Sequence, residues 1–379
     1  MMHVQVNRDT LFRAFVHSQG VIERKTTLLI LGHTLLRAKD GVVTLVSTDM
    51  DMALSETIAA DIVQEGSICV PTVLTYEILR KLKPNSTVNI AFNNDLAQVI
   101  LSSGRSKFEI PCISSDEFPL ILQDGSTFSC SFVLPALVLK NMIETVRFAT
   151  SNDEMRYALN GINFSYDATV GKLRAVATDR HRLASVEVDG PDGAAEMSSI
   201  IVSKKTIGEF SRLLDEAIEP VSLSVSDTRI ELAARFEKSR ITIGSRLIDG
   251  SFPEYSAVLN IKHDKRIVVA AKAFAELIDR VGTVISEKSR VIKVSVSRNL
   301  LRCSAVGSAA GSAAEDIDVD YDDGSEMNLS FDAKYLLDVA QHIASSEMEI
   351  LLTNPDTAVS VRPVGIDGVY FALMPLASQ

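Results

Sequence analysis

The stretch VQVNRDTLFRAFVH at residues 4–17 recurs in pattern as FVLPALVLKNMIETV at 132–146 and as VVAAKAFAELIDRV at 268–281. Each copy opens with a short apolar run and continues with apolar residues spaced three or four positions apart. This pattern predicts a β-strand that leads into an amphipathic helix. The copies follow one another at intervals of about 130 residues, so the chain is expected to repeat one kind of domain.

A second set of segments recurs at nearly the same interval: ICVPTVLTYEILRKL at 68–82, IIVSKKTIGEFSRLL at 200–214 and LSFDAKYLLDVAQHI at 329–343. Runs rich in β-branched residues, such as TVNIAF and VIKVSVS, lie between the two sets and are separated by turn-forming pairs. Two independent sets with one period predict an α+β protein of three repeated domains, each with two helices and two antiparallel sheets. The expected domains are 1–126, 127–258 and 259–379.

The composition describes an acidic globular protein. Of 379 residues, 46% are hydrophobic and 23% are charged, and the formal net charge is −11. No apolar run is long enough to span a membrane, and the first residues lack the features of a secretory signal, so no membrane association is expected. The four cysteines are far apart and form no CxxC pair. This indicates free thiols in a reducing cytoplasm and no zinc site, and nothing in the sequence indicates another metal or a cofactor.

Positive charge is concentrated on the repeated helices of this acidic chain. Four of the six predicted helices carry a net positive charge, whereas the rest of the sequence is strongly acidic. Six solvated amphipathic faces would explain this, and so would a helix-lined surface that faces a polyanion. Trp is absent and aromatic residues do not alternate with the basic ones. A nucleic acid would therefore be contacted through its phosphates and not by base stacking.

The most enzyme-like segment is ATDRHRL at 177–183, which offers a carboxylate, an imidazole and two guanidinium groups. Asp179, His181 and Arg182 could serve acid–base chemistry or bind phosphate, so a nucleic-acid or phosphate-processing enzyme is the alternative function. The first repeat also has a Thr-Asp pair, at Thr48, but no histidine follows it. The pair is therefore interpreted as a recurring turn. No HExxH, GxSxG or P-loop sequence is present.

Several motifs, all in order along essentially the whole chain, resemble one family, the bacterial DNA polymerase III beta subunit, which is the sliding clamp of the replisome. The matching motifs are SGRSKFEI at 103–110, DEFP at 116–119, RYALNG at 156–161, TDRHRL at 178–183, LIDGSFPEY at 247–255 and FALMPL at 371–376.

The resemblance implies a non-catalytic processivity factor of a DNA polymerase holoenzyme. Two protomers would join head to tail into a ring of six domains, and double-stranded DNA would thread through the hole without sequence preference. The partners would be the clamp loader, the replicative polymerase, and repair and translesion polymerases. The resemblance implies that they dock through short linear peptides in a groove between the second and third domains.

Matched motif by motif, the resemblance also implies which residues line each surface. The peptide groove would be lined by Leu159, Thr178, His181, Arg182, Leu183, Pro253, Val258, Ala358, Ala372, Met374, Pro375 and Leu376. DNA would be contacted by Arg24, Lys25, Arg80, Lys83, Arg147, Arg156, Lys204 and Lys205.

The dimer contact is expected at an exposed apolar pair, Phe108 and Ile110, that would meet the region of Val284 and Ile285 in the other protomer. The chain departs from the family in two places. Arg180 stands where the family usually has Gly, and the C-terminus is longer than usual and lacks the usual basic residue.

Overall fold

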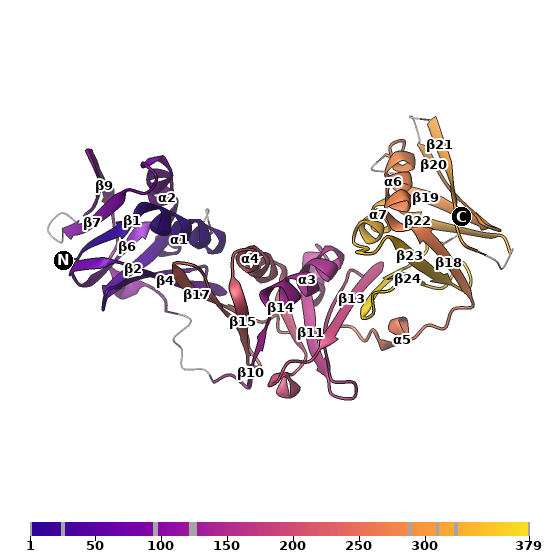
Figure 1. The fold of residues 1–379 in the computed structure, drawn as a ribbon, viewed down its shortest axis with the longest axis horizontal. Coiled ribbons are helices and arrows are strands. Elements are labelled where there is room, and N and C mark those ends of the chain that lie inside the picture. Colours follow the sequence, from indigo (N-terminus) through magenta and orange to yellow (C-terminus); the bar gives the residue numbers. More distant parts are fainter. Residues whose placement is uncertain are drawn as a thin grey trace. The chain divides into compact units, whose positions relative to one another are not determined.

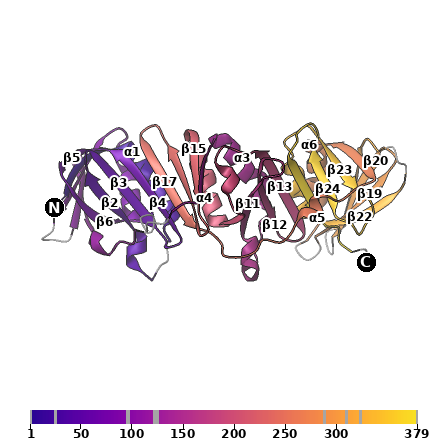
Figure 2. The same cartoon turned by 90° about the horizontal axis from the view of Figure 1, so that it is seen from below.

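The computed structural model describes residues 2–23, 27–93, 98–120, 127–286, 290–307, 311–321 and 325–377 (Figure 1 and Figure 2). Its elements confirm both sets of repeats, because six strands each lead directly into a helix. These pairs are β1 (Met2–Asn7) and α1 (Arg8–Val21), β6 (Gly66–Pro71) and α2 (Thr72–Lys81), β10 (Cys130–Leu134) and α3 (Ala136–Val146), β14 (Ile200–Ser203) and α4 (Lys204–Leu214), β18 (Lys265–Ala270) and α6 (Ala271–Gly282), and β22 (Met327–Asp332) and α7 (Ala333–Gln341).

Short polar side chains fix the start of three of these helices. The Asn7 side chain accepts hydrogen bonds from the backbone N–H groups of Asp9 and Thr10, at 3.0 and 3.2 Å. Ser203 and Asp332 cap α4 and α7 in the same way. Such caps satisfy backbone donors that have no partner within the helix, so they explain why the strands change into helices at these residues.

The chain divides into two compact units, of which unit 1 comprises Met1–Asn141 and Gly190–Ile248. Its smaller sheet has the strand order β5-β1-β7-β8-β9, and its larger sheet has the order β10-β15-β16-β17-β4-β3-β2-β6. The remaining strands are β2 (His33–Lys39), β3 (Val42–Thr48), β4 (Met52–Ala59), β5 (Asp61–Gln64), β7 (Thr87–Asn93), β8 (Gln98–Ser103), β9 (Ser106–Pro111), β15 (Ile218–Val225), β16 (Arg229–Arg235) and β17 (Ser239–Arg246).

Unit 2 comprises Met142–Asp189 and Asp249–Gln379. It holds the strands β11-β12-β13-β25-β24-β23-β18 in one sheet and β21-β20-β19-β22 in another. A short helix, α5 (Ser256–Leu259), lies in the segment that precedes β18. The remaining strands are β11 (Gly161–Asp167), β12 (Lys172–Thr178), β13 (Arg182–Asp189), β19 (Val291–Ser297), β20 (Leu300–Gly307), β21 (Gly311–Asp318), β23 (Glu347–Leu352), β24 (Val359–Pro363) and β25 (Val369–Leu373).

Antiparallel pairing continues across the sequence boundaries between repeats. In unit 1, β17 of the second repeat pairs with β4 of the first. In unit 2, β13 of the second repeat pairs with β25 of the third. Each repeat therefore supplies its strands to a larger sheet that it shares with a neighbouring repeat, which the repeat pattern alone did not predict.

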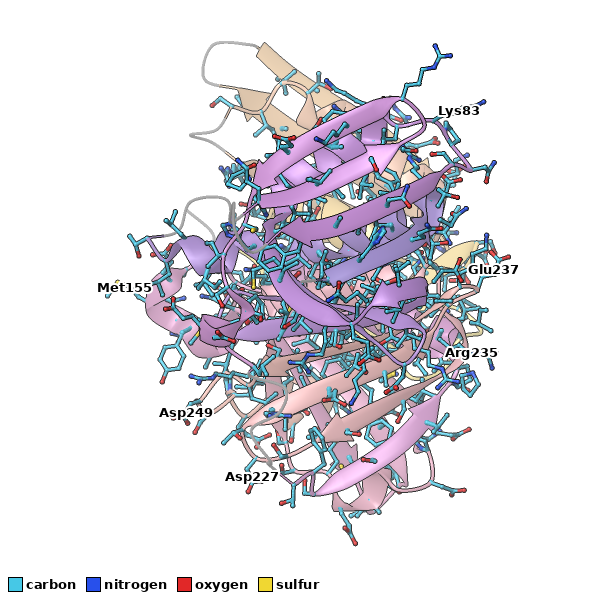
Figure 3. The ribbon with its side chains drawn as sticks, turned by 90° about the vertical axis from the view of Figure 1, so that its left-hand side faces the viewer. Lys83, Met155, Asp227, Arg235, Glu237 and Asp249 are labelled. Carbon is cyan, nitrogen blue, oxygen red and sulfur yellow. The ribbon has the colours of Figure 1, made fainter. Side chains whose placement is uncertain are left out.

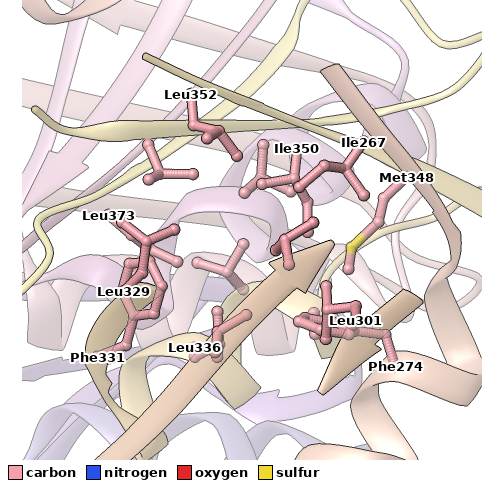
Figure 4. Close-up of a pocket in the computed structure, with 16 residues that line it drawn as sticks. Ile267, Phe274, Leu301, Leu329, Phe331, Leu336, Met348, Ile350, Leu352 and Leu373 are labelled. Atoms are coloured by element: carbon pink, nitrogen blue, oxygen red, sulfur yellow. The ribbon is translucent and has the colours of Figure 1, made fainter. Parts of the chain in front are cut away.

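The interior of unit 2 is tightly packed between its helices and sheets. Phe274, Leu336, Met348 and Leu373 help to line a cavity of about 20 Å³ whose described lining is entirely apolar (Figure 4). A cavity of this size holds about one water molecule, and apolar walls offer that water no hydrogen bonds. The cavity is thus a packing feature of the core and not a ligand site.

The structure corrects one expectation about the predicted dimer contact. Phe108 and Ile110 lie on one face of β9, as alternate residues of a strand should. That face is turned inward: Ile110 is 2% exposed in the core of unit 1, and Phe108 is partly buried against the same core. The expectation of an exposed apolar pair is therefore wrong for Ile110, because this side of β9 faces a core built from α1, α2 and the larger sheet of unit 1, whose strand β6 contacts β9. Val284 and Ile285, after α6, are partly buried.

Candidate functional site

A small apolar cluster lies on the face of the unit 2 sheet that is crossed by residues 249–260, here called the linker segment. Val176, Leu183, Tyr370 and Ala372 are its buried members. Leu183 on β13 lies opposite Ala372 on β25 in the strand register, so the two share one face of the sheet. The linker segment packs Phe252, Tyr255, Val258 and Leu259 onto them. This set is called the apolar cluster below.

Three predicted groove residues, Leu183, Val258 and Ala372, meet in this cluster. Met374 follows directly after β25, is 47% exposed, and donates its backbone N–H to the carbonyl of His181 at 2.9 Å. Leu376 is 38% exposed. Met374 therefore places a pliable apolar side chain in solvent beside the TDRHRL turn, whereas the backbone N–H of Leu376 donates to the carbonyl of Ser330 on β22.

The other predicted groove residues occupy less uniform positions. Pro253 is exposed in the linker segment, and Ala358 and Pro375 are partly buried. Leu159 is buried at the end of the η6 turn (Glu154–Leu159). Gly250 of the LIDGSFPEY motif approaches this turn closely, because a Cβ atom there would lie 3.0 Å from the ring of Tyr157 and 3.2 Å from the Cβ atom of Ala158.

Two aromatic members of the cluster were not predicted. Phe252 and Tyr255 contact each other edge to face, with ring centroids 6.0 Å apart. Both belong to the LIDGSFPEY motif. Large aromatic side chains are mostly buried, so a pair of them in a linker indicates that this segment packs against a neighbouring surface.

The TDRHRL segment forms a tight turn held by its own side chains. Thr178 Oγ1 donates to the carbonyl of Arg182 at 2.7 Å, and the Asp179 carboxylate accepts the backbone N–H groups of His181 and Arg182 at 3.0 Å. The turn at Thr48 in unit 1 has the same bonds: Thr48 Oγ1 donates to the carbonyl of Met52 at 2.9 Å. The interpretation of the Thr-Asp pair as a recurring turn is confirmed.

The same geometry explains the glycine that the family usually has at position 180. Arg180 adopts φ +79°, and Met50 adopts φ +82° at the equivalent place in the first turn. This left-handed region favours glycine, so both side chains are held in a strained backbone conformation.

Arg182 does not share the face of the apolar cluster, in contrast to the expectation that it lines the groove. It precedes Leu183 on the strand, so its side chain lies on the opposite face, and it is only 7% exposed. Its guanidinium group donates to Asp179 at 3.1 Å, to the carbonyl of Phe148 at 2.8 Å and to Asp338. Arg182 is thus a buried structural group.

Aromatic rings complete the environment of this turn. The guanidinium carbon of Arg182 lies 4.4 Å from the ring centroid of Tyr335 and 5.1 Å from that of Phe148. His181 is exposed and stacks on Tyr335, with centroids 5.8 Å apart. Burial raises the pKa of Tyr335, and nearby carboxylates act in the same direction. Tyr335 lies on α7, far away in sequence, and was not predicted as a site residue.

The predicted DNA-contacting residues that the structure describes are all exposed. Lys83 extends into solvent after α2 (Figure 3). Four others already pair with carboxylates of their own chain, and Arg24 and Lys25 lie outside the described residues. The pairs are Arg80 with Glu77 at 2.7 Å, Arg147 with Glu144 at 2.8 Å, Arg156 with Asp153 at 3.3 Å, and Lys205 with Asp49.

The described residues show neither a metal site nor a membrane-spanning helix. Within them, no group of His, Cys, Asp and Glu side chains is arranged to hold a metal ion. No helix in the described ranges has the length and apolar character needed to cross a membrane.

Comparisons with known proteins agree along the whole chain. Sequence profiles of the N-terminal, central and C-terminal domains of the DNA polymerase III beta subunit match residues 2–122, 133–254 and 257–377. The beta sliding clamp of Caulobacter vibrioides is 37% identical over 99% of this chain and 100% of its own length. The beta sliding clamp of Escherichia coli K12 is 29% identical over 99% of this chain and 100% of its own.

Solved structures of sliding clamps have the same fold as this chain. The sliding clamp of Bartonella birtlesii, bound to griselimycin, has a TM-score of 0.94 and 31% identity, with both chains fully covered. The beta sliding clamp of C. crescentus, with PEG bound to a putative beta-motif tethering region, has a TM-score of 0.93 and 36% identity over 100% of this chain and 99% of its own.

A sliding clamp is a processivity factor and not a catalyst, so the enzyme interpretation of Asp179, His181 and Arg182 is wrong. Two of these three residues are engaged within the turn described above, which agrees with that correction. The chain belongs to the DNA polymerase III beta subunit family, the sliding clamps of bacterial DNA replication.

Proposed function

We propose that two copies of this clamp close head to tail into a ring that encircles duplex DNA and tethers the replicative polymerase. The domain boundaries that we propose are 1–126, 127–258 and 259–379, and the three matched ranges, 2–122, 133–254 and 257–377, support them. The proposed compartment is the cytoplasm. All four cysteines are described and free, and burial raises the pKa of Cys69 and Cys303 to about 12, as suits unreactive thiols in a reducing environment.

Two open sheet edges support the head-to-tail contact. β9 is an edge strand of unit 1 and β21 is an edge strand of unit 2, so each has a row of backbone groups that another copy could pair. Their charges are complementary: β9 and the residue before it carry Arg105, Lys107 and Glu109, a net charge of +1, whereas β21 carries Glu315, Asp316 and Asp318 and no basic residue. Within the protomer, Lys107 pairs with Glu109, Arg280 with Glu315 and Arg302 with Asp316, so the contrast between the two edges is moderate. Opposite charges favour this pairing over contacts between two like edges. Phe108, Ile110, Val284 and Ile285 would then lie close to the contact, with Ile110 supporting β9 from inside.

Reversing the charge of the β9 edge tests this contact without disturbing the core. The double substitution Arg105→Glu and Lys107→Glu would place like charges opposite β21, so we expect the dimer dissociation constant to rise by at least about tenfold. Sedimentation velocity over a dilution series measures it. Asp61→Lys on β5, the other edge of the same sheet, is the matched control and should leave the dimer intact. An unchanged dimer in the double variant would place the interface elsewhere.

We further propose that partners dock a short peptide on the apolar cluster beside Met374. The carrying observation is that Leu183, Val258 and Ala372 meet in one cluster, and that exposed Met374 follows Ala372 by two residues and is bonded to the TDRHRL turn. An apolar surface with a flexible methionine suits several related peptides, so the clamp loader and the replicative, repair and translesion polymerases could share it. His181, Thr178, Pro253, Ala358 and Pro375 would form the surroundings, whereas the buried Arg182 would support the turn.

Removing apolar contact area should weaken peptide binding. Burying two large apolar side chains contributes roughly 3–6 kcal/mol before ordering costs, so losing part of this area in Leu183→Ala with Met374→Ala should weaken affinity by about 10- to 100-fold. Isothermal titration with a clamp-binding peptide from a bacterial replicative polymerase measures this. Leu300→Ala, which trims another exposed leucine of unit 2, is the control. If the double variant binds as tightly as the wild type, the peptide site lies elsewhere.

A further inference from the structure

A series of hydrogen bonds ties the linker segment to the sheet beneath it. Tyr370 donates its hydroxyl to the backbone carbonyl of Val258 at 2.7 Å. The Tyr370 oxygen lies 2.6 Å from Ser360 Oγ, and Ser360 Oγ lies 2.6 Å from His263 Nε2. Ser360 is 1% exposed and Tyr370 is 8% exposed. These four residues are called the linker anchor below.

The direction of every bond in the linker anchor follows from chemistry. A carbonyl can only accept, so the Tyr370 proton is used on Val258. The Ser360 hydroxyl must then donate to Tyr370, and His263 Nε2 must carry the proton that it donates to Ser360. His263 Nδ1 is buried and has no hydrogen-bond partner among the described residues, which fits a neutral ring protonated at Nε2. Burial lowers the pKa of His263, and the charge of Arg362 lowers it further, so the neutral form is favoured.

The linker anchor matters because it lies beside a gap between the linker segment and the sheet. This gap is a polar cavity of about 660 Å³, and its lining includes Ser256 and Leu259 of the linker segment and Arg362 and Tyr370 of the sheet. Arg362 lies over the Tyr370 ring, 5.2 Å from its centroid, so the ring is held from that side. The Tyr370 ring belongs to the apolar cluster while its hydroxyl reaches the backbone of Val258. One side chain thus joins the floor of the cluster to the segment that covers it.

We propose that Tyr370 is a positioning residue that holds Val258 against Leu183 and Ala372 and so sets the shape of the apolar surface offered to partner peptides. This inference rests on the proposed peptide site. The ring supplies packing area, whereas the hydroxyl fixes the position of the linker segment. Losing the hydroxyl leaves the cluster apolar but allows Val258 to move away from it.

The decisive variant is Tyr370→Phe, which removes one oxygen atom. The dissociation constant of a fluorescein-labelled clamp-binding peptide from a bacterial replicative polymerase should rise about fivefold in fluorescence anisotropy, as expected for one hydrogen bond. Tyr321→Phe is the matched control, because Tyr321 is also buried in unit 2 and donates to a backbone carbonyl, that of Ser325, at 3.1 Å. It should leave the peptide affinity unchanged.

A double-mutant cycle separates positioning from a general loss of stability. Val258→Ala should raise the dissociation constant of the peptide in the wild-type background. In the Tyr370→Phe background, the same substitution should raise it by less than half that fold-change. If Tyr370 had only a structural role, Tyr370→Phe would lower the unfolding midpoint. The effects of Tyr370→Phe and Val258→Ala on the dissociation constant would then be independent. Ser360→Ala breaks the linker anchor one bond further away and should act in the same direction, which keeps the test available if Tyr370→Phe folds poorly.

Leu183→Ala distinguishes failure of this inference from failure of the peptide site. If Leu183→Ala leaves peptide binding unchanged, the proposed site itself is wrong, and the inference falls with it. If Leu183→Ala weakens binding while Tyr370→Phe and Ser360→Ala do not, or if the cycle shows no coupling, the peptide site stands and the positioning role of Tyr370 is overturned.

Discussion

After loading onto a nicked circular plasmid, the protein is expected to stay on the DNA and to be lost once a restriction enzyme cuts the circle. The reason is that the chain has a net charge of −11, and four of its candidate DNA-contacting residues already pair with carboxylates. Direct attraction to phosphates is therefore weak, and a closed ring retains DNA by topology. Gel filtration of labelled protein with the plasmid should show at least a tenfold drop in the bound fraction after cutting.

Salt provides the control for this experiment. A protein that holds DNA by 6–10 phosphate contacts loses about 10³–10⁵ in affinity between 50 and 200 mM salt, because bound counterions are released. Retention on the uncut circle should change by less than about twofold over that range if topology dominates. Lys83→Glu should lower the amount loaded but keep the dependence on closed DNA. Equal retention on the circle and on the linear product would contradict a threaded ring.

Arg182→Ala is expected to destabilise unit 2 by about 3–5 kcal/mol, which is typical when one partner of a buried ion pair is removed. The substitution would leave the carboxylates of Asp179 and Asp338 without their cation and the carbonyl of Phe148 without its donor. Chemical denaturation followed by circular dichroism, with hydrogen exchange to assign the loss to unit 2, measures it. Arg182→Lys should recover only part of the loss because an ammonium group cannot reproduce the planar fork.

The adjacent arginine is the matched control for Arg182. Arg180 is exposed and has φ +79°, so Arg180→Gly relieves backbone strain and should stabilise the protein by up to about 1 kcal/mol. Two arginines separated by one residue should thus respond in opposite directions. A loss of less than 1 kcal/mol for Arg182→Ala would mean that the buried network contributes little.

The sequence predicted the six helices and the α+β class because each depends on local patterns repeated along the chain. Leu11 and Leu139, for example, occupy equivalent buried positions in α1 and α3. The recurring turn was also predictable, because Thr48 and Thr178 form their bonds within four residues. Local hydrogen bonding of this kind needs no knowledge of the rest of the fold.

The predictions that failed depend on which face of a strand is covered. Alternation placed Phe108 and Ile110 on one face but could not show that this face turns toward the core of unit 1, which strands and helices from elsewhere in the chain complete. Arg182 was assigned to the peptide site from its neighbours in the motif, whereas strand alternation turns it toward Tyr335 on α7. Tyr335 reaches Arg182 only through tertiary folding, from a position more than 150 residues away in sequence, and the bond from Tyr370 to Val258 spans 112 residues.

The shared sheets described above also have a mechanical meaning. β17 and β4 are paired over seven residue positions, and β13 and β25 over five, so each boundary between repeats is crossed by a ladder of backbone hydrogen bonds and not by a flexible linker alone. Bending either joint would break several of these bonds at about 1 kcal/mol net each. A force that opens a closed ring should therefore separate the contact between the two copies first. Opening at that contact leaves the β17–β4 and β13–β25 ladders inside each protomer intact.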